Sequence, residues 1–142
     1  MTISLFNEIE GLSLENLTTA TLGYLIKKDT SKESSFLKFI DCKSNEVYQI
    51  ETQANIQEVG KFDLYIYNDE ESIIIENKFY AKYTNGDQLT RYFNYLKKKK
   101  QIKKQLIILT IKKREKYNRE EISKQLGVQF LDYLAIKNNI EV

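Results

Sequence analysis

Residues 60–92 read GKFDLYIYNDEESIIIENKFYAKYTNGDQLTRY, and this stretch decides the fold of the chain. Two runs within it, residues 62–67 and 72–77, are rich in β-branched and aromatic residues and predict two strands. The acidic segment 68–71 between them predicts a tight turn. We therefore expect an antiparallel hairpin, followed by an amphipathic helix over residues 87–100.

The expected pairing of this hairpin brings two carboxylates together. Counting outward from a turn centred between Asp69 and Glu70 places Asp63 opposite Glu76. Lys78 lies two residues further along and shares the face of Glu76. Directly opposed like charges destabilise a sheet by up to ~1 kcal/mol, so this arrangement calls for a compensating cation. Lys78 supplies one positive charge, and a divalent ion would supply two.

Two carboxylates and an ammonium predict a site for Mg²⁺ or Mn²⁺, which prefer oxygen ligands. Such an ion can activate a water and offset the charge that develops on a phosphate, while Lys78 orients the water or the phosphate. The pattern therefore predicts a metal-dependent nuclease that hydrolyses phosphodiester bonds. The alternative is a surface ion-pair cluster, since Asp41-Cys42-Lys43 also has an acid two residues before a lysine.

The predicted helix after the hairpin carries a second polar pair. Gln88 and Tyr92 are four residues apart and project from one helical face. They are expected to contact the substrate or to steady the carboxylates. The alternative is an ordinary amphipathic helix with a polar neighbour.

Composition excludes several kinds of hydrolase. The chain of 142 residues contains no histidine and one cysteine, Cys42. It therefore lacks the ligands of a usual tetrahedral zinc site, and it cannot form a Ser-His-Asp or Cys-His pair. Its length suits a single domain, residues 1–142. The lone cysteine, the absence of a long apolar run and the acidic start of the chain favour a cytoplasmic protein that does not cross a membrane.

The formal net charge is only +2, but basic residues cluster after the predicted helix. Such clusters can neutralise the phosphates of a nucleic acid. The alternative is a solvated helix end. The residues expected to hold nucleic acid are Arg91, Lys97, Lys98, Lys100 and Lys104.

The remaining elements complete a mixed α/β (α+β) fold. We expect a first helix over residues 13–27, with Leu17, Thr21, Tyr24 and Leu25 along its apolar stripe. Strands are expected at 46–53 and 106–111, and residues 36–40 are ambiguous. The C-terminal part predicts a helix over 119–126 ending at Gly127, a strand over 128–133 and a short last helix. The order is αβββαβ plus an appended strand and helix, a mixed β-sheet flanked by helices.

This order and these residues resemble the PD-(D/E)XK nuclease superfamily, in the branch with E-N-K and Q-x-x-x-Y motifs and a restriction-endonuclease-like core. The resemblance rests on Asp63, on the run IIIENK at 73–78 and on QLTRY at 88–92. It implies metal ligation by Asp63, Glu76 and the backbone carbonyl of Asn77, with Lys78 as the catalytic lysine. Glu15 fits the acid that the first helix often adds. Phe62 stands where the superfamily's proline would be.

Two other functions stay open. The first is a catalytically silent module on the same fold that binds nucleic acid. The second is a protein-interaction domain that uses its many tyrosines. DNA is the expected substrate, and RNA stays open as an alternative. A homodimer or a partner protein also stays open, as does a longer protein of which this chain is the N-terminal part.

Overall fold

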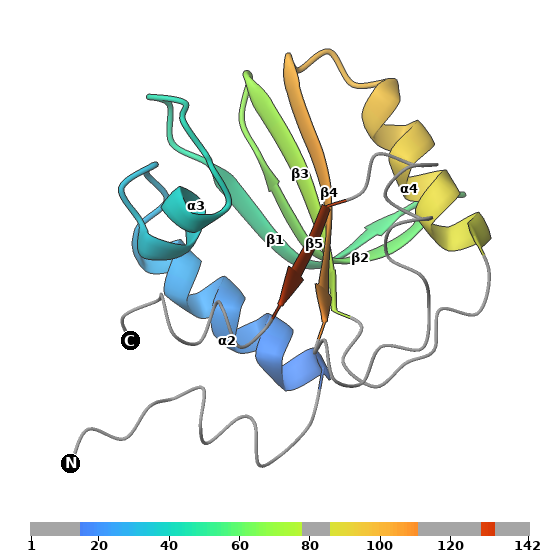
Figure 1. The fold of residues 1–142 in the computed structure, drawn as a ribbon, viewed down its shortest axis with the longest axis horizontal. Helices are drawn as coiled ribbons and strands as arrows, with labels where there is room; N and C mark the ends of the chain where they lie inside the picture. Colours follow the sequence, from blue (N-terminus) through green and yellow to red (C-terminus); the bar gives the residue numbers. More distant parts are fainter. Residues whose placement is uncertain (1–14, 78–85, 111–128, 133–142) are drawn as a thin grey trace.

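The computed structural model describes residues 15–77, 86–110 and 129–132, which form one sheet between helices (Figure 1). The expected mixed α/β fold, with a sheet flanked by helices, is confirmed. A membrane-spanning helix is not found in these ranges. In chain order the elements are α2 (Glu15–Lys28), α3 (Ser35–Phe39), β1 (Gln49–Ile56), β2 (Gly60–Tyr67), β3 (Glu71–Asn77), α4 (Gly86–Lys97), β4 (Lys103–Thr110) and β5 (Gln129–Asp132).

The five strands lie in the order β1-β2-β3-β4-β5. The first three form an antiparallel meander, while β4 runs parallel to both β3 and β5. Helix α4 lies in the connection between the parallel strands β3 and β4, which a short turn cannot make. The expected hairpin register is confirmed, because Tyr67 pairs with Ser72 and Tyr65 with Ile74.

Some predicted boundaries were wrong. Strand β1 covers Gln49–Ile56 rather than 46–53, because the backbone N–H of Tyr48 donates to Thr30 O (2.8 Å) instead of joining the sheet. The ambiguous segment 36–40 lies mostly in the short helix α3, where the Ser34 hydroxyl accepts a hydrogen bond from Leu37 N (3.4 Å). The predicted strand 128–133 corresponds to β5. The predicted helix 119–126, Gly127 and the last helix lie outside the described residues.

Helix α2 buries a different face from the one predicted. Tyr24 is 60% exposed, whereas Thr19, Leu22 and Ile26 are almost fully buried. These three residues and Gly23 follow the i, i+3, i+4, i+7 spacing of one helical face. Tyr24 was therefore wrongly placed on the buried stripe, whereas Leu25 of the same predicted stripe does pack against the core.

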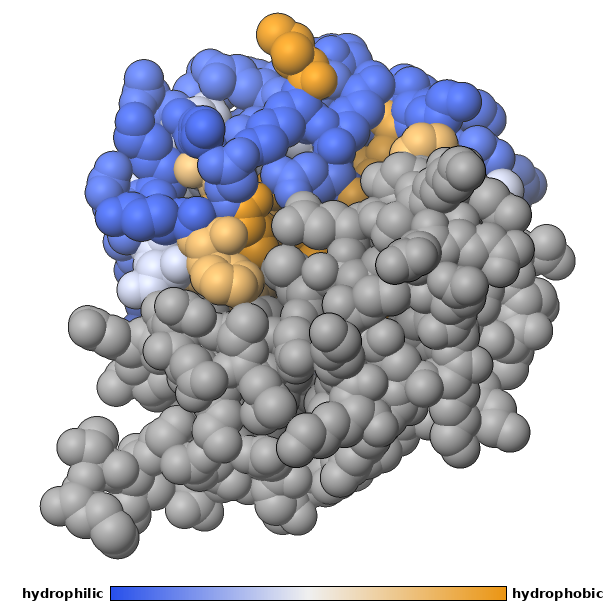
Figure 2. Space-filling model, viewed as in Figure 1, coloured by the Kyte–Doolittle hydropathy of each residue, from blue (hydrophilic) through white to orange (hydrophobic). Residues whose placement is uncertain are grey.

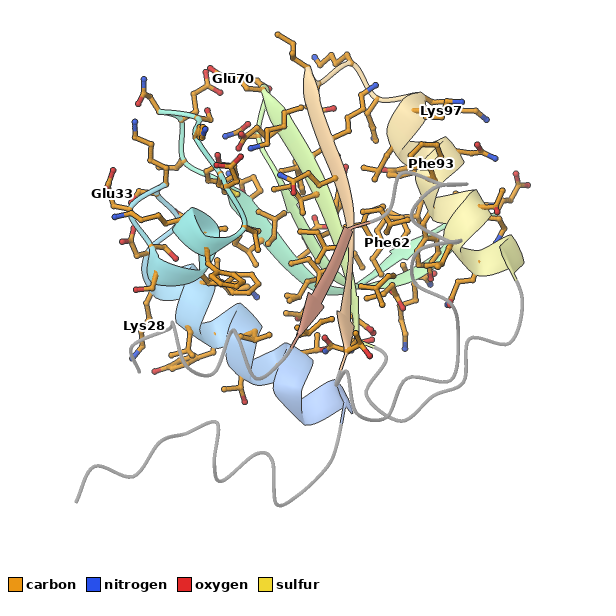
Figure 3. The ribbon with its side chains drawn as sticks, in the orientation of Figure 1. Lys28, Glu33, Phe62, Glu70, Phe93 and Lys97 are labelled. Carbon is orange, nitrogen blue, oxygen red and sulfur yellow. The ribbon has the colours of Figure 1, made fainter. Side chains whose placement is uncertain are left out.

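Two hydrophobic cores lie on opposite faces of the sheet (Figure 3). The first packs α2 and α3 against the central strands, with side chains such as Leu22, Leu64 and Ile75. The second packs α4 against the other face, through Leu89, Tyr92 and Phe62 among others. Every residue of β3 is buried, as expected for a strand covered on both sides.

The described outer surface is mainly hydrophilic in the view of Figure 2, with hydrophobic residues in small patches. The large hydrophobic side chains that are exposed in the described ranges are scattered along the chain, at Tyr24, Val47 and Ile102. Scattered apolar residues of this kind are normal on a protein surface.

A buried carboxylate fastens the loop before β1 to the sheet. Glu71, which is 4% exposed, accepts hydrogen bonds from the Tyr48 hydroxyl and from Lys43 N (3.2 Å). The ammonium of Lys103 lies 3.6 Å from the same carboxylate. Because each of these groups compensates a charge removed from water, the cluster is structural rather than reactive.

Cys42 lies beside this cluster and is buried. Burial, followed by the charge of Glu71, raises the pKa of the thiol to about 12. We expect the folded protein to resist Ellman's reagent at mildly alkaline pH, because the reagent needs the thiolate. Denatured protein should react at once, and equally fast labelling of the folded protein would contradict this expectation.

The same pKa shift has a consequence for stability. The unfolded thiol loses its proton near its ordinary value of 9, whereas the folded thiol keeps it up to about 12. The unfolded state is therefore favoured as the pH rises through this window. The free energy of unfolding should fall less steeply above pH 9 in Cys42→Ala, as measured by urea titration at several pH values.

Candidate active site

Asp63 and Glu76 meet where the pairing of β2 with β3 ends. The backbone ladder stops at Leu64 and Ile75. At the next position, Asp63 N donates to Glu76 Oε1 (3.1 Å), and Asn77 N donates to Asp63 Oδ2 (2.8 Å). Each carboxylate thus accepts a backbone N–H of the opposite strand, so the two acids lie side by side across the hairpin, as the register predicts.

The carboxylate oxygens of this pair are suitable ligands for a hard divalent cation. Glu76 is 3% exposed and Asp63 is partly buried, so both carboxylates are partly removed from water. A carboxylate can accept about four hydrogen bonds or metal contacts, and the backbone N–H groups do not use this capacity up. Mg²⁺ is commonly held by one or two carboxylates, with water and phosphate oxygens completing its shell. Among the described residues, no group of three or more His, Cys, Asp or Glu side chains gathers to hold a metal.

An irregular backbone surrounds Asp63. Leu64 packs with α2 whereas Phe62 packs with α4, although residues two apart in a regular strand share a face. Opposite Asp63 on β1, Gln53 has a left-handed φ of 52° and interrupts the pairing of the two strands. A left-handed non-glycine residue in a strand is strained, and strain of this kind collects at functional sites. Simple alternation along β2 could therefore not predict where the Asp63 carboxylate lies.

Helix α2 reaches the carboxylate pair through Asn77. The Asn77 side-chain amide donates to the Thr19 hydroxyl, and both residues are almost fully buried. Glu15, the predicted further acid, is the first residue of α2 and lies one helical turn before Thr19. The position of its side chain lies outside what the structure describes, as does the whole of Lys78.

Gln88 and Tyr92 share one face of α4, as their spacing predicts. Gln88 Nε2 donates to the Tyr92 hydroxyl (3.2 Å), which donates to Lys61 O (2.9 Å). Burial, then the negative charge of Glu76, raises the pKa of Tyr92 to about 12, so its phenol stays protonated. Gly60 makes room for the ring, since a Cβ there would lie 3.0 Å from the Tyr92 hydroxyl. The pair thus fixes β2 just before Asp63.

We expect Tyr92→Phe to destabilise the fold by about 1–2 kcal/mol. The substitution keeps the buried ring and removes the two hydrogen bonds of the hydroxyl, each worth about 1 kcal/mol. Urea unfolding measures the change, and Tyr24→Phe on the exposed side of α2 is the matched control. Equal stability of the two variants would mean that the Tyr92 hydroxyl does not support β2.

The lysines predicted to bind nucleic acid lie toward the end of the sheet that is away from the carboxylates, whereas Arg91 lies near the start of β2. Lys104 pairs with Ser72 on β3, whereas Glu76 pairs with Ile108, four residues or about 13 Å further along. Lys104 Nζ donates to Lys97 O (3.1 Å). Lys97, Lys98 and Lys100 are exposed after or at the end of α4, and Arg91 Nε donates to Val59 O (3.0 Å). The role of all five residues stays a prediction, and a ligand that touched both the lysines and the carboxylates would have to extend along the sheet.

A small cavity of about 240 Å³ opens near the carboxylates and is lined by Thr19, Ala20, Thr52, Gln53 and Lys61. None of these five residues was predicted as a site residue from the sequence. Lys61 could have been found, because it lies two residues before Asp63 and immediately before the predicted strand 62–67. Nothing in the sequence marked Thr19 or Gln53, since their places depend on the contact with Asn77 and on a left-handed φ.

Comparison with known proteins identifies a family. A family model described as the PD-(D/E)XK nuclease superfamily matches residues 3–141, which is nearly the whole chain. No curated protein and no solved structure gives a significant match.

Proposed function

Because the chain belongs to the PD-(D/E)XK nuclease superfamily, we propose that it is a Mg²⁺- or Mn²⁺-dependent deoxyribonuclease that hydrolyses phosphodiester bonds. The observation that carries this proposal is the carboxylate pair, in which Asp63 and Glu76 each accept a backbone N–H across the hairpin. A cytoplasmic location agrees with this activity and is part of the proposal.

The chain's own residues have distinct roles in this proposal. Asp63, Glu76 and the backbone carbonyl of Asn77 hold the ion, and Glu15 extends this set from α2. When bound, the ion lowers the pKa of a water and offsets charge on the phosphate. Lys78 orients the water or the scissile phosphate through its ammonium.

Gln88 and Tyr92 position the site rather than take part in the chemistry. The protonated Tyr92 hydroxyl donates to the carbonyl of Lys61, two residues before Asp63, and so holds β2 in place. The fixed backbone keeps the two carboxylates together before the ion arrives. Preorganisation of this kind is what a metal site requires for tight binding and correct geometry.

The substrate is proposed to be DNA, with Arg91, Lys97, Lys98, Lys100 and Lys104 contacting phosphates beyond the scissile one. Contacts to phosphates weaken steeply with salt. A test with matched single-stranded and double-stranded DNA and RNA, at low and moderate salt, separates the substrate classes. Cleavage of RNA without cleavage of DNA would contradict the proposed substrate but agree with the proposed phosphodiester hydrolysis.

The decisive experiment compares cleavage by the parent protein, Asp63→Ala and Lys78→Ala, each with Mg²⁺ and with Mn²⁺. We expect the parent to cut DNA and both variants to cut it about 10³-fold more slowly. The bound ion and the lysine are each expected to lower the activation free energy by several kcal/mol. Cleavage by the variants at the parent's rate would show that the assigned site is wrong.

The rival function is a silent module that binds nucleic acid without cutting it. Calorimetry with Mn²⁺ distinguishes the two, because a silent module has no need of an ion at Asp63. Heat of Mn²⁺ binding that disappears in Asp63→Ala supports the nuclease, and its absence from the parent supports the silent module.

A further inference from the structure

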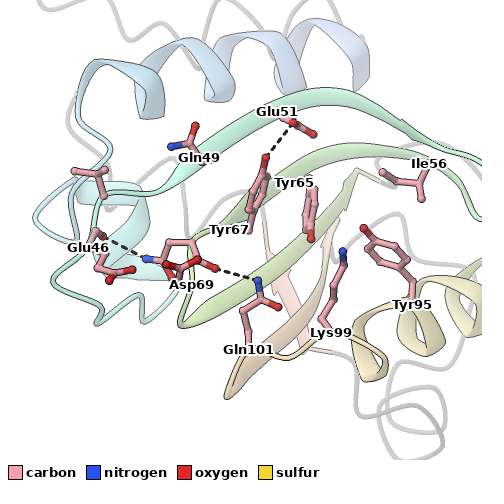
Figure 4. A pocket seen from close by; sticks show the side chains of 12 residues that line it. Glu46, Gln49, Glu51, Ile56, Tyr65, Tyr67, Asp69, Tyr95, Lys99 and Gln101 are labelled. Carbon is pink, nitrogen blue, oxygen red and sulfur yellow. Dashed lines mark hydrogen bonds between the residues drawn. The ribbon is translucent and has the colours of Figure 1, made fainter.

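A larger pocket of about 640 Å³ lies on the α4 side of the sheet, near the β2–β3 turn (Figure 4). Its aromatic lining consists of Tyr65 and Tyr67 from β2 and Tyr95 from α4. Neither Asp63 nor Glu76 lines it, and Tyr65 and Tyr67 follow Asp63 by two and four residues on the same strand, about 7 and 13 Å away. The pocket is therefore separate from the carboxylate pair, and its volume is within the range that binds small ligands.

Two aromatic rings of this pocket are stacked on one another, and a cation of the chain lies over the third ring. The rings of Tyr65 and Tyr67 are stacked, with centroids 4.6 Å apart and an angle of 26° between their planes. Lys99 Nζ lies 4.6 Å from the centroid of Tyr95. The chain's own lysine thus shows that an ammonium group fits against one ring of this pocket, that of Tyr95.

The charged groups of the pocket are mostly acidic. Glu46, Glu51 and Asp69 provide three negative charges against the single positive charge of Lys99, which leaves a net charge of −2. Glu51 Oε1 accepts a hydrogen bond from the Tyr67 hydroxyl (3.2 Å). Burial, followed by the charge of Glu51, raises the pKa of Tyr67. A phosphate would be repelled here, whereas a cation would be attracted.

We propose that this tyrosine pocket binds an organic cation with several N–H donors, and that a guanidinium group fits it best. A planar guanidinium can stack on the tyrosine rings while its N–H groups donate in pairs to carboxylates such as that of Glu51. The guanidinium can come from an arginine side chain of a partner protein or from a small free guanidine. Neither source depends on the proposed nuclease activity.

Binding can be measured by tyrosine fluorescence, because the chain contains ten tyrosines and no tryptophan. The probes are a capped tripeptide with a central arginine, agmatine and spermidine, with the corresponding glutamine tripeptide as the uncharged control. We expect the cations to bind and the glutamine tripeptide not to bind. Tighter binding of the arginine tripeptide identifies a polypeptide as the source, and tighter binding of agmatine identifies a small free guanidine. Tighter binding of spermidine than of both would contradict the preference for a guanidinium.

Variants locate the binding. Tyr67→Leu should weaken it about 10-fold through loss of the ring, and Glu51→Gln about 5-fold through loss of an exposed charge. Tyr67→Phe keeps the ring and should retain most of the affinity. Asp63→Asn should leave cation binding unchanged, so that failure here and failure of the nuclease proposal can be told apart.

Two results would overturn the proposal. The first is equal affinity of the parent and Glu51→Gln, which removes charge at the rim without touching the core. The second is that the cations do not bind, whereas a single-stranded oligonucleotide binds to the parent and not to Tyr67→Leu. The pocket would then accept a nucleobase instead of a cation. Circular dichroism of each variant checks that its fold is intact.

Discussion

Asp63→Asn should weaken Mn²⁺ binding by more than about 100-fold and reduce DNA cleavage by about 10³-fold. The substitution removes one charge and keeps the side-chain volume, with an amide oxygen that can still accept the N–H of Asn77. Replacing groups that only support a metal ligand already costs about 10- to 100-fold in affinity, so loss of a ligand should cost more. Titration calorimetry measures the binding, and a cleavage assay measures the rate.

The fold should survive this substitution. The free energy of unfolding should change by no more than about 1 kcal/mol, because the amide has the volume of the carboxylate and its oxygen can still accept the N–H of Asn77. Glu70→Gln, an exposed acid in the turn of the same hairpin, is the control and should leave metal binding unchanged. An equal loss of binding in both variants would mean that the hairpin's total charge, and not Asp63, attracts the ion.

Gly23→Ala should destabilise the protein by about 1–2 kcal/mol, although alanine is the better helix former. In an exposed helix the change would stabilise by up to about 1 kcal/mol. Here the new Cβ would lie 2.4 Å from Thr52 Cγ2, because α2 crosses β1 at this point. Overpacking of a core costs about 1–3 kcal/mol and therefore outweighs the gain in helix propensity.

The double variant Gly23→Ala, Thr52→Ala tests this explanation. Thr52→Ala removes the methyl group that clashes, and the remaining Thr52 Cβ lies 3.9 Å from the new atom. The double variant should therefore be more stable than the sum of the two single changes predicts, as measured by urea unfolding. Strict additivity would show that the close approach of α2 to β1 is not the cause.

The hairpin could be predicted from the sequence because its strands and turn are specified by residues close together in the chain. β-Branched runs on either side of an acidic turn determine both strands and their register, as the pairing of Tyr65 with Ile74 confirms. Helix α4 was predicted for the same reason, from the apolar spacing of Leu89 and Leu96. The start of β1 and the buried face of α2 were predicted wrongly, because they depend on contacts with residues far along the chain.

The sequence alone determined which groups this protein offers: two acids in hairpin register, a lysine two residues after the second acid, and no histidine. Only the tertiary structure decided how the acids meet. Their backbone ladder ends one residue early, and the carboxylates accept the N–H groups that the ladder leaves unused. The left-handed Gln53 and the tyrosine pocket likewise arise from packing between distant segments, which no local pattern of residues encodes.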